Sequence, residues 1–302
     1  MVRVRYIDHL HFKDKAIERI NDHFGSGLTL SRRSGDLPVW MLDFSKSDPP
    51  LAIAEFVCEL HQNALKNQFS LANELGDYLE FIKQFDSSRP DGSFPPMFND
   101  LVNIKYALED LQPDLILEIG GGVSSSLFGR YSDLSGCKYF LVDPEYEWAS
   151  NTLRILNEIP GINAPQLLNL KIHEVYREVQ IIDPVDGIRK KAAVGNNKEF
   201  NYSSEELFEA VESSKKPLVY VDASPKGSVG QGAEFILNDR LRGALSGGLC
   251  LVDCRWQALM LLGAYTRNIY TSACDVRVTG KRVLTSNNWA LMEDLAFSAF
   301  AL

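Results

Sequence analysis

Short runs of consecutive apolar residues alternate with amphipathic stretches from about residue 98 onward. The clearest runs lie at 115–119, 138–143, 217–222 and 248–253. Strands that are apolar on both faces belong to parallel sheets with helices packed on each side. The pattern therefore predicts an α/β fold built on a doubly wound, mostly parallel sheet.

Further strand signals lie between and after these runs. A strand is expected at 168–175, and a β-rich stretch at 275–285 is split by Gly280 and followed by the apolar-rich residues 289–292. Two β-rich runs separated by a glycine are typical of a hairpin. We therefore expect a seven-stranded sheet that ends in an antiparallel C-terminal hairpin.

The N-terminal part of the chain has a different pattern. Residues 52–85 carry apolar side chains at helical spacing, and a cluster of turn formers follows at 86–96. We predict a mainly helical accessory segment at 1–95, acting as a lid or a homodimer contact, and a Rossmann-like catalytic domain at 96–302. Residues 176–201 are too long for a simple strand-to-helix connection, so they are expected to be an insertion.

Charge and cysteine content exclude several classes of protein. The net charge of the 302 residues is −9, which disfavours binding to the phosphate backbone of nucleic acids. No apolar stretch is long enough to cross a membrane, and the N-terminus lacks the apolar core of a secretory signal. The five cysteines form no CxxC pair, which predicts reduced thiols and a cytoplasmic location.

A glycine triplet follows the first of the strong strands. Gly120, Gly121 and Gly122 permit a sharp turn and a close approach of a ligand to the backbone. A helix expected to begin near Ser124 would direct its free N–H groups to the same place. Asp143 ends the next strand, where an acid can accept hydrogen bonds from both hydroxyls of a ribose. Together these features predict a dinucleotide or adenosyl cofactor.

Four strands carry an acid at or near their carboxyl ends: Glu118, Asp143, Asp222 and Asp253. One such acid is explained by a helix cap. Four of them would meet at one edge, because the ligand crevice of an open α/β sheet lies outside the carboxyl ends of its strands. We therefore expect these acids to line a single site.

Three segments resemble motifs of the class I S-adenosylmethionine-dependent methyltransferases: LEIGGGVSS at 117–125, LVDP at 141–144 and VYVDASP at 219–225. The resemblance extends from about residue 98 to the C-terminus and includes the closing antiparallel hairpin. It implies S-adenosylmethionine as the cofactor and methyl transfer as the activity.

The resemblance also implies roles for single residues. Glu118 and the glycines would meet the methionine part of the cofactor, Asp143 would bind the ribose, and Asp222 would lie near the transferred methyl group. Trp148, just after the ribose acid, is the aromatic residue that we favour for contact with the adenosine.

The methyl acceptor is expected to be a small molecule that is methylated on oxygen or nitrogen. Asp222 and Asp253 look like two of the three metal ligands of the small metal-dependent O-methyltransferases, but Cys254 stands where their third ligand is an asparagine. A thiol is a poor ligand for Mg²⁺, so no metal is predicted. Lys226 is one residue further from Asp222 than the general-base lysine of those enzymes. Asp222, Lys226 and Asp253 are the candidate catalytic residues, and a solvated loop lysine is the alternative interpretation of Lys226.

Two other functions remain open. An NAD(P)-binding oxidoreductase is disfavoured because Ser125 occupies the last small position of the dinucleotide fingerprint. A non-catalytic protein that keeps the methyltransferase fold is compatible with the altered positions Cys254 and Lys226.

Overall fold

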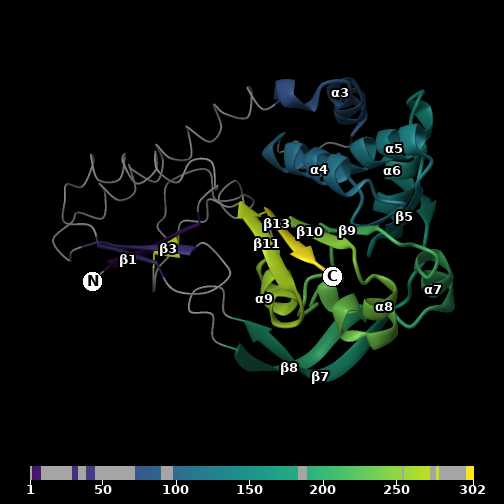
Figure 1. The fold of residues 1–302 in the computed structure, drawn as a ribbon. Helices are drawn as coiled ribbons and strands as arrows, with labels where there is room; N and C mark the ends of the chain where they lie inside the picture. The colour runs from purple at the N-terminus through teal and green to yellow at the C-terminus, as the bar shows by residue number, and fades with distance from the viewer. Residues whose placement is uncertain are drawn as a thin grey trace.

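The computed structural model describes residues 2–7, 29–32, 39–44, 72–89, 98–182, 189–253, 255–272, 277–278 and 297–302 (Figure 1). Within these ranges, no helix combines the length and the apolar composition that crossing a bilayer requires.

The centre of the fold is a sheet with the strand order β11-β13-β10-β9-β4-β5-β6. Its strands are β4 (Leu115–Ile119), β5 (Lys138–Val142), β6 (Gln166–Leu167), β9 (Pro217–Val221), β10 (Leu249–Asp253), β11 (Arg267–Ser272) and β13 (Phe297–Ala301). The strands from β10 to β6 pair in parallel, and β13 pairs antiparallel with both β10 and β11. The expected α/β architecture with a mostly parallel sheet is confirmed.

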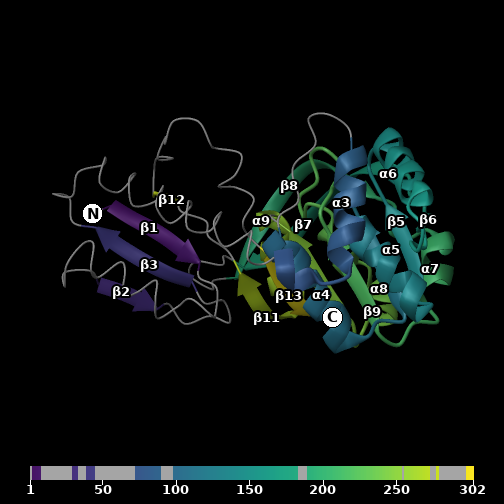
Figure 2. The same ribbon diagram turned by 90° about the horizontal axis from the view of Figure 1, so that it is seen from above.

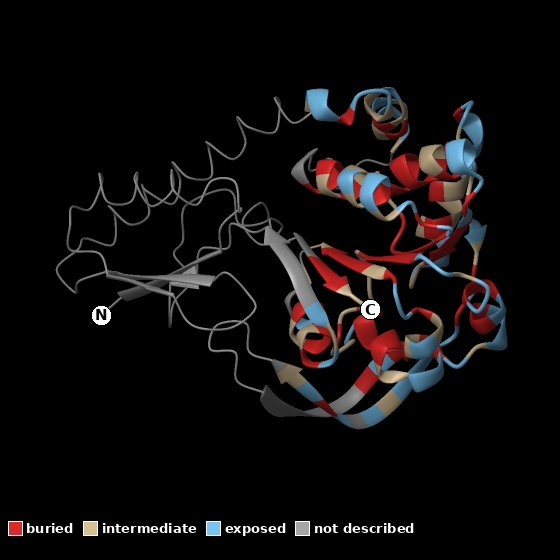
Figure 3. Ribbon diagram, in the orientation of Figure 1, coloured by how far each residue is buried: buried red, intermediate tan, exposed pale blue. Residues whose placement is uncertain are grey.

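Helices cover both faces of this sheet, as the doubly wound pattern requires (Figure 1). One face carries η1 (Ala72–Leu75), α3 (Tyr78–Ser88), α4 (Phe98–Leu111), α5 (Ser124–Ser135) and α6 (Tyr146–Glu158). The other face carries α7 (Glu205–Val211), η2 (Ala233–Leu237), α8 (Asp239–Ala244) and α9 (Trp256–Tyr265). Buried residues concentrate in the strands and on the helix surfaces that face them (Figure 3).

Alternate residues of each strand enter two separate buried clusters. In β4, Ile116 packs with α4 and α5, whereas Leu117 packs with the helices of the other face. In β9, Tyr220 belongs to the first cluster and Val219 to the second. This alternation follows from the two-residue period of a strand. It also places the acid Glu118, two residues after Ile116, on the side of α5.

The third strand of the sheet differs from the expected strand at 168–175. Only β6, at residues 166–167, pairs with β5, while Leu168 and Leu170 are buried as core residues beyond it. The chain then forms a separate antiparallel pair of β7 (Ile172–Ile182) and β8 (Arg189–Phe200). The inserted segment is thus a hairpin that begins before residue 176, and Val179 anchors it in the core.

The antiparallel closure of the sheet is present, but other residues form it. The strands are β11 and β13, and not a hairpin at 275–285. Within that stretch, β12 (Arg277–Val278) pairs with β1 (Val2–Ile7) in a second sheet, and the expected turn at Gly280 lies outside the described residues. The strand propensity of residues 275–285 is confirmed at 277–278, which are extended. It did not identify β1 as the partner strand.

The N-terminal segment was expected to be mainly helical, and this is wrong for its described first half. The strands β1, β2 (Thr29–Arg32) and β3 (Val39–Phe44) pair antiparallel in the second sheet, whose order is β12-β1-β3-β2. The alternating sequence VRVRYI of β1 carried a strand signal that the helical interpretation overlooked. Most of the helical pattern at 52–85 lies outside the described residues, but its end forms η1 and α3.

Helix α3 packs on the α/β part of the molecule and lies beside α5 (Figure 2). Leu75 and Ile82 are fully buried in the same cluster as Ile104 and Leu127. This end of the predicted accessory segment therefore contributes to the core of the sheet domain.

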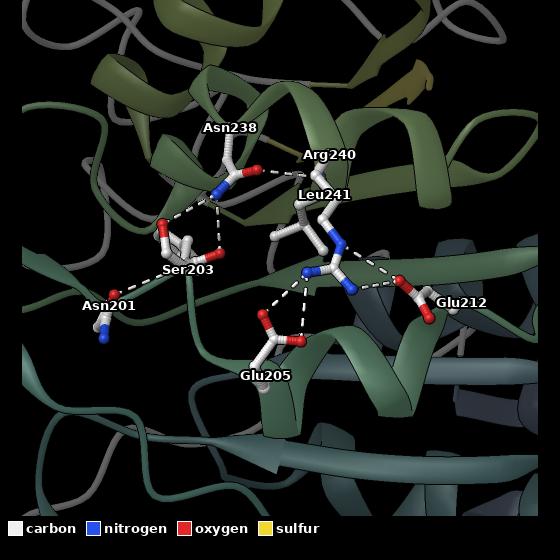
Figure 4. A network of polar contacts seen from close by, with 8 residues as sticks. Asn201, Ser203, Glu205, Glu212, Asn238, Arg240 and Leu241 are labelled. Atoms are coloured by element: carbon white, nitrogen blue, oxygen red, sulfur yellow. Dashed lines mark hydrogen bonds and ion pairs between the residues drawn. The ribbon is translucent and has the colours of Figure 1, made fainter.

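A polar network ties α7 to α8 on the opposite face (Figure 4). The Arg240 guanidinium contacts Glu205 at 2.9 Å and Glu212 at 2.5 Å. Asn238 caps α8, because its side-chain oxygen accepts a hydrogen bond from Leu241 N at 3.1 Å. All three charged side chains are largely exposed, so the ion pairs contribute little to stability.

Candidate functional site

The candidate site lies at the carboxyl edge of the central sheet. From β4 the chain proceeds to β5 and β6 on one side, and then to β9 and β10 on the other side. The carboxyl ends of the neighbouring strands β4 and β9 therefore form the topological switch point, where open α/β sheets bind their ligands. The glycine loop follows β4 at this point, and Asp222 follows β9.

Gly120 is held tightly between the ends of three strands. Its φ angle is +104°, and a Cβ atom there would lie 2.4 Å from the Cβ of Ala223. Ile119 O accepts hydrogen bonds from the N–H groups of Asp222 and Ala223, both at 2.8 Å. Gly120 N donates to Val142 O at 2.8 Å. Only glycine satisfies both the backbone conformation and the close contact.

The next two glycines have different surroundings. Gly121 N donates to Asp143 Oδ2 at 2.9 Å, and a Cβ at Gly121 would lie 3.2 Å from side-chain atoms of Leu141 and Thr152. A Cβ at Gly122 would meet no atom within 4 Å. The loop is thus packed at its first two glycines and open at the third.

This contrast predicts a large loss of stability for one alanine substitution and a small change for another. Gly120→Ala should reduce the free energy of unfolding by about 2 kcal/mol, because it combines backbone strain with a clash against Ala223. Gly122→Ala should change it by less than about 0.5 kcal/mol, since the added methyl group enters open space. Urea unfolding of both variants measures the difference. Equal losses for both would contradict the described loop geometry.

Glu118 is completely buried beneath the glycine loop. It accepts hydrogen bonds from Ser124 Oγ at 2.6 Å, from Ser125 Oγ at 2.7 Å and from the Tyr139 hydroxyl. Burial raises the pKa of Glu118 to about 7, although the three hydroxyl donors oppose this shift. The Glu118 side chain therefore fixes the start of α5, and it stabilises the glycine loop indirectly through its hydrogen bonds with Ser124 and Ser125.

Asp143 stands at the end of β5 and holds the loop from the side. Its Oδ2 accepts from Gly121 N, and its Oδ1 accepts from Glu145 N at 2.8 Å. Burial raises the pKa of Asp143, whereas these two hydrogen bonds lower it. A carboxylate has about four lone-pair positions, so two acceptor positions remain for a ligand.

A cavity of about 230 Å³ opens beside Asp143. Its walls come from the β5–α6 connection, the start of α6 and residues 167–172, and they include Tyr146. Trp148, expected to contact the adenosine, directs its indole N–H to Gly121 O and so supports the glycine loop. The exposed ring of Tyr146 is the aromatic group that lines this cavity.

Asp222 and Asp253 end neighbouring strands, and Arg255 lies next to them. The guanidinium of Arg255 donates to the main-chain oxygen of Asp222, and its Nη2 lies 3.5 Å from Asp222 Oδ1. Burial and the charge of Asp253 raise the pKa of Asp222 well above its ordinary value, while Arg255 opposes the shift. Tyr220 Oη contacts Asp253 Oδ2 at 3.3 Å. The two strand-end acids therefore lie next to a cation of the same chain, the guanidinium of Arg255.

Two charged residues near these acids were not predicted from the sequence: the cation Arg255 and the buried acid Asp100. Asp100 in α4 is buried, and its charge raises the pKa of Tyr220 together with the charges of Asp253, Asp222 and Glu118, after the larger effect of burial. An arginine two residues after a strand-end acid was a signal for Arg255. The position of Asp100 on a helix face offered no comparable signal.

Lys226 is exposed in a turn of the loop after β9. Glu234 fixes that loop from inside, because its buried carboxylate accepts hydrogen bonds from Gly230 N at 2.6 Å and from Gly232 N at 3.0 Å. Cys254 lies outside the described residues. Among those described, no three His, Cys, Asp or Glu side chains are grouped to hold a metal ion.

Comparison of the sequence with models of protein families and with curated protein sequences gives no match. The functional argument therefore depends on the geometry of the site.

Proposed function

We propose that this protein binds S-adenosylmethionine at the carboxyl edge of its sheet and transfers the methyl group to an oxygen or nitrogen atom of a small molecule. One observation carries this proposal. At the switch point of the strand order, the glycine loop is joined to the acid of the neighbouring strand through the hydrogen bond from Gly121 N to Asp143. This combination suits a ligand that presents a ribose to the acid and a chain to the loop.

The residues of the site fit an adenosyl cofactor in three respects. Asp143 retains acceptor capacity for two ribose hydroxyls. The cavity beside it is lined in part by apolar residues, among them Leu168 and Leu170, which suit a purine. Gly122 leaves open space where a side chain would obstruct the ligand.

The bound cofactor would supply an electrophilic methyl group on a sulfonium. Asp222 and Asp253 would favour positive charge near the end of β9. Asp222 would also accept the proton that the acceptor hydroxyl or amine loses on methylation. Its raised pKa suits this role, because a carboxylate with higher proton affinity is a stronger base.

The structure also bears on the dinucleotide alternative. Ser125, at the last position of the fingerprint, is fully buried, donates to Glu118 and accepts from Gly122 N at 3.0 Å. The hydroxyl is therefore part of the loop's own hydrogen bonding. The dinucleotide fingerprint has glycine or alanine at this position so that the helix packs closely on the strand, and the departure at Ser125 favours an adenosyl ligand over NAD.

Ligand-induced thermal stabilisation tests the proposal. S-Adenosylmethionine or S-adenosylhomocysteine at a hundredfold excess over Kd should stabilise the protein by about 2.7 kcal/mol, whereas NADH should not. Stabilisation by NADH alone would support the oxidoreductase alternative. Binding of the adenosyl ligands without turnover of any acceptor in a screen would support the non-catalytic alternative.

A further inference from the structure

Arg255 lies two residues after the end of β10 and immediately before α9, and its side chain reaches Asp222 at the end of β9. The guanidinium is engaged with Asp222 on one side through Nη2. Its Nε is buried and has no hydrogen-bond partner among the described residues. Arginine presents its N–H groups as a planar fork that matches a carboxylate. The side chain thus has donor capacity that its partner Asp222 does not use.

The position of this guanidinium relates it to the glycine loop. Asp222 N donates to Ile119 O, and Gly120 packs against Ala223. Arg255 therefore lies one residue away from the contact between the end of β9 and the glycine loop. A ligand that extends from the loop toward β9 would approach the guanidinium.

The charges of the site indicate which part of the cofactor Arg255 could bind. Asp143, Asp222 and Asp253 make the edge acidic, which suits the sulfonium and the ammonium group of S-adenosylmethionine. The same acids would repel its carboxylate unless a cation compensated for them. Lys226 and Lys171 are both exposed, so water screens their charges. Arg255 is the partly buried cation of this edge, with 31% of its side chain exposed.

We propose that Arg255 binds the carboxylate of the methionine moiety of the cofactor, an inference that rests on the proposed function. In this arrangement the guanidinium bridges Asp222 and the ligand. It would fix the amino-acid end of the cofactor against β9 while Asp143 fixes the ribose end against β5.

The test compares two ligands that differ only in this carboxylate: S-adenosylhomocysteine and its decarboxylated analogue, which keeps the amine. Isothermal titration calorimetry on the full chain gives both Kd values. A hydrogen-bonded charged pair corresponds to about a 10- to 100-fold change in Kd. Arg255→Met should weaken S-adenosylhomocysteine by about this factor and leave the analogue within about twofold. Arg255→Lys keeps the charge without the fork and should show an intermediate loss.

Arg240→Met is the matched control, because it removes another guanidinium that contacts carboxylates on the surface between α7 and α8. It should change neither Kd. Equal weakening of both ligands by Arg255→Met would overturn the inference, since Arg255 would then only shape the Asp222 loop. Unchanged Kd values for both would overturn it as well.

Two further results separate this inference from the proposed function. If the wild type binds both ligands with equal affinity, the inference fails and the proposed function stands. If the wild type binds neither, both fail. Should Arg255→Met not fold, the wild-type ratio and the Arg255→Lys variant still decide the question.

Discussion

Replacement of Asp143 with alanine should abolish the stabilisation of this protein by S-adenosylmethionine and S-adenosylhomocysteine. The ribose hydroxyls of the ligand would lose two hydrogen bonds, each contributing about 1.5–3 kcal/mol because the acceptor is charged. The expected increase in Kd is therefore about 100-fold or more. The substitution also removes the side chain that orients Gly121 N, which would loosen the loop that the ligand contacts.

The measurement is the shift in Tm at a fixed ligand concentration, together with the Tm of the ligand-free variant. Asp114→Ala is the matched control. Asp114 also accepts two backbone N–H groups, from Lys215 at 2.9 Å and from Lys216 at 3.1 Å, but it precedes β4 and lies at the opposite edge of the sheet. Its loss should lower the Tm and preserve the ligand-induced shift. A normal shift in Asp143→Ala would contradict the ribose assignment.

The second large effect is on the pH dependence of stability. The pKa of Glu118 is about 7 in the folded protein, compared with an ordinary value of 4.5. The folded state therefore binds this proton more tightly than the unfolded state does. Stability from this group is fully present below pH 4.5 and is lost as the pH rises to about 7. At 1.36 kcal/mol per pH unit, the loss amounts to about 3 kcal/mol.

Glu118→Gln should remove this contribution, because the amide does not titrate and can still hydrogen-bond to Ser124, Ser125 and Tyr139. The free energy of unfolding from urea titrations at pH 5 and pH 7 would then differ less in the variant than in the wild type. An unchanged pH slope in Glu118→Gln would show that Glu118 does not titrate in this range.

Much of the central sheet could be predicted from local sequence. The apolar runs at 115–119, 138–143, 217–222 and 248–253 correspond closely to β4, β5, β9 and β10. Most positions of these strands are buried on both faces, so apolar residues dominate and the signal is strong. Helix α4 begins at Phe98, where the amphipathic stretches of the sequence also begin, and Pro113 follows its last residue.

Elements with long-range partners were harder to predict. The pattern at 275–285 does not reveal that residues 277–278 pair with β1, or that β13 inserts between β10 and β11. Strand β6 is too short to leave a period in the sequence. Strand pairing depends on which edges the rest of the fold leaves available, and no local window contains that information.

In the candidate site, too, some features could be predicted from local sequence and others depended on the tertiary structure. The sequence by itself determined the glycine loop and the strand-end acids, because these residues are local to a strand and the turn that follows it. The tertiary structure alone decided their contacts: Glu118 faces the start of α5, Trp148 supports the loop, and Arg255 lies beside Asp222. The contacts of Trp148 and Arg255 join residues that are distant in the chain, and the strength of all three contacts depends on burial and on the angle of approach. Both quantities exist only once the sheet and its helices are packed together.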